Sequence, residues 1–234
     1  MLEALREQVL EANREVVRRG LVLYTFGNVS GISRADGLVV IKPSGVSYER
    51  MAADDMVVTD LDGHVVWGGL RPSSDLNTHL HLYRSFPAIG GVVHTHSEFA
   101  VIWAQARRSI PALGTTHADY FYGPVPATRE LTREEIEGDY VLATGVAITD
   151  CFGNRDPMEV PAVVVADHGP FCWGLDADDA VHNAVVLEAV ARMAYHTITL
   201  EPDKPGISQA LLDRHYKRKH GTAATYGQET PGPA

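Results

Sequence analysis

Gly90-Gly91-Val92-Val93-His94-Thr95-His96-Ser97 is a run of apolar, β-branched residues that leads directly into a His-x-His pair. Side chains two residues apart on a strand point to the same side, so His94 and His96 present two imidazoles to one point in space. Neutral imidazoles are common ligands of zinc-class ions. The same spacing also fits two surface histidines at the end of a strand, so the choice depends on the rest of the chain.

A second buried strand is predicted over residues 162–167, and it also runs into a histidine, His168. Residues 89–94 and 162–167 are both apolar enough to lie at the centre of a sheet. If the two strands are neighbours, His168 lies beside His94 and His96 and gives a three-imidazole site with one open face. Three protein ligands and an exchangeable position are typical of catalytic zinc, whereas structural zinc sites usually close four ligands.

Few other side chains compete for such a metal. Asp75 follows a serine-rich turn and could supply a carboxylate as a fourth ligand that weakens when substrate arrives. Cys151 and Cys172 stand in no ligand spacing, so core thiols are expected there. His79 and His81 are also two residues apart, but they fall in helical sequence, where such side chains diverge by about 200° and cannot share one ion.

The remaining hydrophobic pattern combines strands in hairpins with covering helices. It predicts an α/β fold, a three-layer sandwich with a central, mostly antiparallel sheet covered by helices. Asp36-Gly37 and Asp62-Gly63 separate β-type runs and indicate hairpin turns. A single domain is expected over residues 1–226, with a flexible C-terminal tail over 227–234. Helices are predicted over residues 2–19, 76–83, 97–107, 132–145, 177–196 and 209–220, and further strands over 38–42 and 56–59.

The composition of the 234-residue chain excludes several classes of protein. Its net charge of −10 argues against a nucleic-acid or membrane-surface binder, whose affinity rests on basic patches. A small anionic substrate remains compatible, because a few local donors can outweigh a distant, screened field. Two cysteines imply no disulfide framework, and no signal-like start or apolar run of about 18 residues occurs. We therefore expect a cytoplasmic protein with a small-molecule partner.

Three turns rich in glycine and serine indicate a place for an anion. Residues 27–30, Ser44-Gly45 and Ser73-Ser74 can each expose backbone N–H groups and hydroxyls, and Lys42 lies close by in the sequence. Such groups bind a phosphate without a P-loop. Each turn is also compatible with an ordinary loop, so the indication comes from their number together with the lysine.

Several of these stretches together resemble the class II aldolase/epimerase family, and the resemblance covers nearly the whole chain. They are residues 26–30, 41–45, 72–75, 91–97 and 167–171. Further stretches resemble the branch of that family that epimerises pentulose phosphates: residues 114–121, 179–184 and 212–221, together with Tyr226-Gly227-Gln228.

The resemblance implies a Zn²⁺ cofactor, or another divalent metal in its place, and a homotetramer with active sites at the subunit interfaces. Asp119 and, from a neighbouring subunit, Tyr226 would form an acid/base pair. Related aldolases carry a glutamate where this chain has Asp75, so the shorter carboxylate favours an epimerase. The implied metal ligands are Asp75, His94, His96 and His168, and the implied phosphate pocket contains Gly27, Asn28, Ser44, Gly45, Ser73 and Ser74.

The expected reaction is the interconversion of L-ribulose 5-phosphate and D-xylulose 5-phosphate at C4, by retro-aldol cleavage and re-formation of the C3–C4 bond. The nearest alternative is a class II sugar-phosphate aldolase that releases a free aldehyde. A zinc hydrolase is disfavoured because the chain lacks His-Glu-x-x-His. A non-enzymatic scaffold on the same fold would be expected to lose the three histidines, which are all present.

Overall fold

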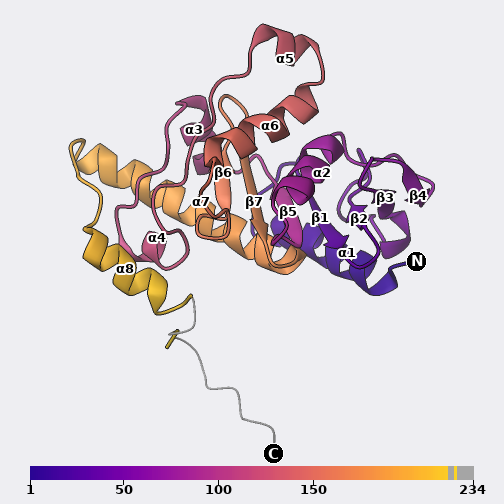
Figure 1. Ribbon diagram of the computed structural model, residues 1–234, viewed down its shortest axis with the longest axis horizontal. Helices are drawn as coiled ribbons and strands as arrows, with labels where there is room; N and C mark the ends of the chain where they lie inside the picture. Colours follow the sequence, from indigo (N-terminus) through magenta and orange to yellow (C-terminus); the bar gives the residue numbers. More distant parts are fainter. Residues whose placement is uncertain (221–223, 226–234) are drawn as a thin grey trace, which may run out of the picture.

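An antiparallel sheet of seven strands forms the centre of the described part of the protein (Figure 1). The computed structural model describes residues 1–220 and 224–225. The strand order is β4-β3-β2-β1-β5-β7-β6. The strands are β1 (Asn28–Ser33), β2 (Leu38–Ile41), β3 (Val57–Asp60), β4 (Val65–Trp67), β5 (Gly91–His94), β6 (Ala162–Val164) and β7 (Pro170–Gly174). The helices are α1 (Glu3–Arg18), α2 (Leu76–Ser85), α3 (Glu98–Gln105), α4 (Thr115–Ala118), α5 (Arg133–Glu137), α6 (Tyr140–Phe152), α7 (Ala177–Leu200) and α8 (Gln209–Lys217), with a 3-10 turn η1 (Ala53–Asp55).

Helices cover both faces of the sheet, which confirms the predicted α/β sandwich. Successive residues of β1 point to opposite faces of the sheet. The position of Gly31 faces Leu5 and Val9 of α1, whereas the Ser30 hydroxyl faces α2. The helix α7 packs on β5 and β7 on the same side as α1, and α2 packs with α6 on the other side. The α2–α6 pair and the α1–α7 pair lie on opposite sides of the strands in Figure 1.

Both predicted hairpins are confirmed. The first joins β1 to β2 and the second joins β3 to β4, with antiparallel pairing in each. Gly37 and Gly63 have φ values of +65° and +89°, which residues other than glycine rarely adopt, so the Asp-Gly pairs provide the turn geometry.

The predicted pairing of residues 89–94 with 162–167 is wrong. The strand β7 lies between β5 and β6, and it pairs with both. The sequence did not reveal β7, because it begins with Pro170 and ends with Gly174, both of which weaken a strand pattern. The strand β6 is also shorter than predicted, because the chain turns after Val164, with the Val165 N–H donating to the Gly169 carbonyl at 2.9 Å. His168 therefore lies in the turn that joins β6 to β7.

Helix boundaries differ mainly at one place. The predicted helix 132–145 is two helices, α5 and α6, which separate at Gly138 because its ψ of −131° breaks the helix. Each part has its own N-cap: the Thr132 side chain accepts from Glu135 N–H, and Asp139 accepts from Leu142 N–H. In the part of the chain that the structure describes, no helix is long and apolar enough to cross a membrane. The predicted tail over 227–234 and Tyr226 lie outside the described residues.

Candidate active site

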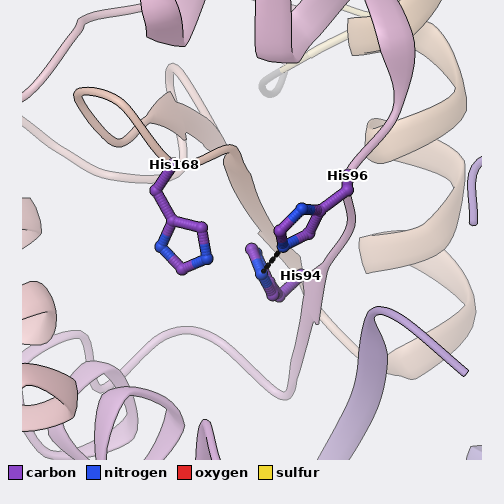
Figure 2. A group of neighbouring side chains, drawn as sticks. All are labelled: His94, His96 and His168. Atoms are coloured by element: carbon purple, nitrogen blue, oxygen red, sulfur yellow. Dashed lines mark hydrogen bonds between the residues drawn. The ribbon is translucent and has the colours of Figure 1, made fainter.

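Three imidazoles meet at one end of the central strands (Figure 2). His94 is the last residue of β5, His96 follows two residues later, and His168 comes from the β6–β7 turn. One nitrogen from each ring lies within 4.8 Å of the others. The structure thus brings together the three predicted ligands, although β7 rather than β6 is the neighbour of β5.

Hydrogen bonding and burial fix the state of His94. Its Nδ1 lies 2.9 Å from the Pro170 carbonyl, which can only accept, so Nδ1 carries the proton and Nε2 keeps a lone pair. The ring stacks on Phe171 with 4.2 Å between the ring centroids. Burial lowers the pKa of His94 to about 3, so the imidazole is neutral at neutral pH.

The other two rings complete a neutral donor set. Nε2 of His96 lies 3.1 Å from Nε2 of His94, and burial lowers the pKa of both His96 and His168. Nitrogen ligands about 2.05 Å from a tetrahedral zinc lie about 3.3 Å from one another. The His94–His96 spacing and the neutral rings therefore fit a divalent ion that takes nitrogen ligands.

Asp75 lies at the edge of this group and not inside it. It precedes α2 as its N-cap residue, and its Oδ2 accepts a 2.6 Å hydrogen bond from Asn28 Nδ2. Burial alone would raise the pKa of Asp75, but the neighbouring His94 and His79 and the bond from Asn28 outweigh it, so the pKa lies below its usual value. Asn28 itself is held opposite His94 by the pairing of β1 with β5. A carboxylate is thus fixed beside the three rings.

The predicted anion-binding turns line the same cavity, which has a volume of about 410 Å³. Lys42 is 2% exposed, and burial lowers its pKa. Its Nζ lies 3.3 Å from the Pro43 carbonyl and 4.7 Å from the centroid of the Tyr48 ring. These neutral partners leave its charge without a carboxylate among the described residues, so a bound anion would complete its contacts. The lining residues include Gly27, Asn28, Lys42, Ser44, Gly45, Ser73, Ser74, Asp75, His94, His96 and His168.

Two glycines allow the backbone to close around the rings. Gly27 has a φ of +79°, and a Cβ there would lie 2.7 Å from the His94 carbonyl oxygen. A Cβ at Gly169 would lie 2.9 Å from the Thr95 carbonyl oxygen. Both distances are shorter than any ordinary contact, so these turns require glycine.

Asp119 does not line this cavity in its own chain. It follows α4, and its carboxylate is held by α8 and the residues after it: Arg218 donates to both oxygens, at 3.0 Å and 2.8 Å, and His215 Nδ1 lies 3.0 Å from Oδ1. Partial burial alone would raise the pKa of Asp119, but the bonds from Arg218 and His215 outweigh it and hold the pKa below its usual value. The carboxylate is therefore ionised and fixed, away from the three histidines of the same chain. Tyr226, its predicted partner, lies outside the described residues.

One side chain at the site was not predicted. The Tyr140 hydroxyl lies 3.2 Å from His168 Nδ1. Tyr140 is the first residue of α6, whose separate start was hidden within the single predicted helix. Asp139, a favoured N-cap residue directly after Gly138, could have revealed this helix start, but not the contact with His168.

The second His-x-His pair lies on α2, and its two rings diverge, as predicted. His79 Nδ1 lies 2.7 Å from the Ser30 hydroxyl of β1, and His81 Nε2 lies 3.1 Å from the Thr149 hydroxyl of α6. The two rings therefore face different elements. Both cysteines are free thiols, Cys172 buried and Cys151 partly buried.

Comparison with known proteins gives one consistent result. The sequence model described as "Class II Aldolase and Adducin N-terminal domain" matches residues 7–195. The fold is similar to that of an L-fuculose 1-phosphate aldolase, with a TM-score of 0.78, 22% identity, and coverage of 92% of this chain and 95% of that one. It is also similar to YgbL from Klebsiella pneumoniae, with a TM-score of 0.73, 24% identity, and coverage of 92% and 99%. An L-fuculose 1-phosphate aldolase from Glaciozyma antarctica PI12 matches with a TM-score of 0.77, 16% identity, and coverage of 96% and 84%.

Proposed function

Since the chain belongs to the class II aldolase and adducin family, we propose that it is a metal-dependent epimerase that interconverts L-ribulose 5-phosphate and D-xylulose 5-phosphate at C4. The observation that carries this proposal is the joining of two features in one cavity. Three neutral imidazoles lie at one side of it. Lys42, which is buried without a carboxylate partner among the described residues, lies with the serine- and glycine-rich turns at the other. A metal-dependent reaction on a phosphorylated sugar uses both.

We assign His94, His96 and His168 as ligands of Zn²⁺, with Asp75 as a further ligand. Neutral nitrogen donors and an adjacent carboxylate match the preferences of this ion. When bound, the ion would supply Lewis-acid stabilisation of the negative charge that develops on the oxygens at C2 and C3. Asn28 holds Asp75 in place from the neighbouring strand by the 2.6 Å hydrogen bond.

We assign the opposite side of the cavity to the phosphate of the substrate. Lys42 would supply the charge, and its burial makes a charge-assisted hydrogen bond stronger than it would be in water. Backbone N–H groups and hydroxyls would supply the remaining donors. These come from Gly27, Asn28, Ser44, Gly45, Ser73 and Ser74, which line the cavity.

The proposed chemistry is cleavage and re-formation of the C3–C4 bond. The proton at C4 of a ketopentose is β to the carbonyl and not acidic, so direct removal is unfavourable. Cleavage gives two fragments, glycolaldehyde phosphate and the enediolate of dihydroxyacetone, which keeps the electron pair of the broken bond. The aldehyde rotates while its phosphate stays bound, and attack of the enediolate carbon on its other face re-forms the bond with C4 inverted. The C4 oxygen then needs a proton donor or acceptor on each side, and we assign Asp119 and Tyr226 to these roles.

We further propose that the enzyme is a homotetramer whose sites lie between subunits. The position of Asp119 supports this arrangement, because its carboxylate is held by Arg218 and His215 and does not line the cavity of its own chain. In such an assembly, Asp119 would act at the cavity of a neighbouring subunit.

The experiment that tests the function is an assay of purified, zinc-loaded protein with L-ribulose 5-phosphate, with the products followed by NMR. We expect D-xylulose 5-phosphate to appear, and we expect chelation to stop its formation and added zinc to restore it. Release of a free aldehyde from another sugar phosphate, with no conversion of L-ribulose 5-phosphate, would instead identify a class II aldolase. Asp75 favours the epimerase, because related aldolases carry the longer glutamate there.

A further inference from the structure

The ring of His168 has two nitrogens with different surroundings. Figure 2 shows one of them facing His94 and His96, and the other pointing away from the cluster. The outward nitrogen is Nδ1, which lies 3.2 Å from the Tyr140 hydroxyl oxygen. Within the described part of the chain, this is the one hydrogen bond found for the ring of His168.

The direction of this hydrogen bond follows from the use of the ring as a ligand. A neutral imidazole carries one proton, and the nitrogen that binds a metal must keep its lone pair. If Nε2 of His168 faces the ion, the proton is on Nδ1, and the Tyr140 oxygen accepts it. The opposite arrangement, with the tyrosine donating, would place a proton on Nε2 and block that nitrogen.

His94 shows the same requirement met in another way. Its Nδ1 donates to the Pro170 carbonyl at 2.9 Å, so the backbone of β7 fixes its protonated nitrogen. No backbone acceptor is found for Nδ1 of His168 among the described residues, because the ring lies in the β6–β7 turn and outside the sheet. A side chain from a different element takes that place.

We propose that Tyr140 is a positioning residue, whose hydroxyl accepts the Nδ1 proton of His168 and thereby keeps Nε2 free and aimed at the metal. This inference rests on the proposed function, in which the three histidines hold a divalent ion. Removing a residue that hydrogen-bonds the second nitrogen of a metal-binding histidine typically weakens metal affinity by about 10–100-fold.

The local structure suits this role. Tyr140 begins α6 directly after the N-cap Asp139, which accepts from Leu142 N–H at 3.0 Å. The Thr144 hydroxyl donates to the Tyr140 carbonyl at 2.8 Å, so the first turn is held from both ends. The helix α6 packs on α2, the helix that begins directly after Asp75. Tyr140 thus reaches the ring from a fixed helix end.

The test compares the zinc affinity of the wild type with that of Tyr140→Phe, which keeps the ring and removes only the acceptor oxygen. Metal-free protein is titrated with Zn²⁺ in competition with a chromophoric chelator. We expect Tyr140→Phe to bind zinc about 10–100-fold more weakly, with the thermal midpoint of the metal-free protein unchanged. Tyr195→Phe is the matched control, since Tyr195 is 42% exposed on α7, and it should bind zinc like the wild type.

A second measurement reports on the tautomer itself. In ¹⁵N-labelled, metal-free protein, we expect the His168 ring to carry its proton on Nδ1 in the wild type and to populate the Nε2–H form in Tyr140→Phe. Equal zinc affinity and an unchanged tautomer in Tyr140→Phe would overturn the inference. Equal zinc affinity with slower turnover would also overturn it, by placing the hydroxyl on the substrate. A wild type that binds no zinc would instead contradict the metal site of the proposed function.

Discussion

Asp167 and Arg107 both have a left-handed backbone, with φ values of +61° and +54°, and their side chains form a two-point ion pair. Arg107 Nε donates to Oδ1 of Asp167 at 3.0 Å, and Nη2 lies 3.0 Å from Oδ2. The Asp167 N–H also donates to the Ala104 carbonyl at 3.0 Å. The residue before His168 is therefore fastened to the end of α3, which is the helix that follows His96.

The first prediction concerns the backbone at Asp167. Asparagine tolerates a positive φ and should replace it with a loss of less than about 1 kcal/mol, because the pair with Arg107 is half-exposed. Valine should lower the free energy of unfolding by about 1–2 kcal/mol more, because a β-branched residue is strained in the left-handed region. Urea denaturation of Asp167→Asn and Asp167→Val measures the difference. Equal stability of the two variants would show that the turn relaxes without cost.

The second prediction concerns the metal. His168→Asn should reduce bound zinc to well below one per chain and slow turnover by about 10³-fold or more, because the lost charge stabilisation is worth several kcal/mol. His64→Gln is the control, since Asp60, Asp62 and His64 form a second group of potential ligands, on the β3–β4 hairpin. This variant should keep its zinc and its turnover. Elemental analysis of dialysed protein gives the stoichiometry. Full zinc content in His168→Asn would remove this residue from the ligand set.

The third prediction concerns Lys42. Lys42→Met should raise KM for the sugar phosphate by about 10–100-fold, since a hydrogen bond to a charged group contributes about 1.5–3 kcal/mol. The free energy of unfolding without ligand should stay equal or increase, because the variant removes a buried charge that no described carboxylate balances. Steady-state kinetics and urea denaturation measure the two effects. Lys204→Met is the control, since Lys204 is partly exposed and does not line the cavity. Loss of stability with an unchanged KM would assign Lys42 to the core alone.

The fourth prediction concerns pH. Burial lowers the pKa of His79 to about 4, whereas the unfolded chain has the ordinary value of 6.5. Between these values the unfolded state binds more protons, so stability rises with pH in this window and falls as the pH drops through it. The loss from His79 alone approaches about 3 kcal/mol near pH 4. Urea denaturation of metal-free protein between pH 4 and 7.5 should show it, and His79→Gln should have a smaller slope. An equal slope in His79→Gln would place the dependence on other groups.

The fifth prediction concerns Asp119 and subunit contacts. Asp119→Asn and His168→Asn should each be nearly inactive. The turnover of Asp119→Asn should fall by about 10²–10⁴-fold, as expected for the loss of a positioned acid or base. Mixed oligomers made by co-expression should regain activity, because an Asp119→Asn chain keeps its metal ligands and can receive an intact Asp119 from its neighbour. If Asp119 instead acts within its own chain, no site in the mixture is complete and activity stays at the level of the separate variants.

Local patterns in the sequence predicted the parts of the site that depend on local geometry. His94 and His96 share a side because they lie at the end of a strand, and the Asp-Gly pairs at Gly37 and Gly63 predicted both hairpins. His168 was assigned to the site through a pairing that does not exist. The three rings still meet, because β7 joins β5 in register and carries the β6–β7 turn to His94.

Contacts between distant segments could not be read in this way. Nothing near Tyr140 in the sequence indicates His168, because the two residues are 28 positions apart and belong to α6 and to the β6–β7 turn. The ion pairs of Asp119 with Arg218 likewise join residues far apart in the chain. Both depend on tertiary packing, which hydrophobic periodicity does not encode.

The β1–β5 pairing places Asn28 opposite His94, and the residues that line the cavity come from two parts of the chain that meet there. The anion side comes from segments between residues 25 and 75, and the imidazoles come from segments between 94 and 168. A phosphorylated sugar bound with the metal would therefore contact both sets of segments and hold them together where β1 pairs with β5. Substrate occupancy should protect the amides of this junction from hydrogen exchange more than those at either sheet edge, because a ligand stabilises the state it binds.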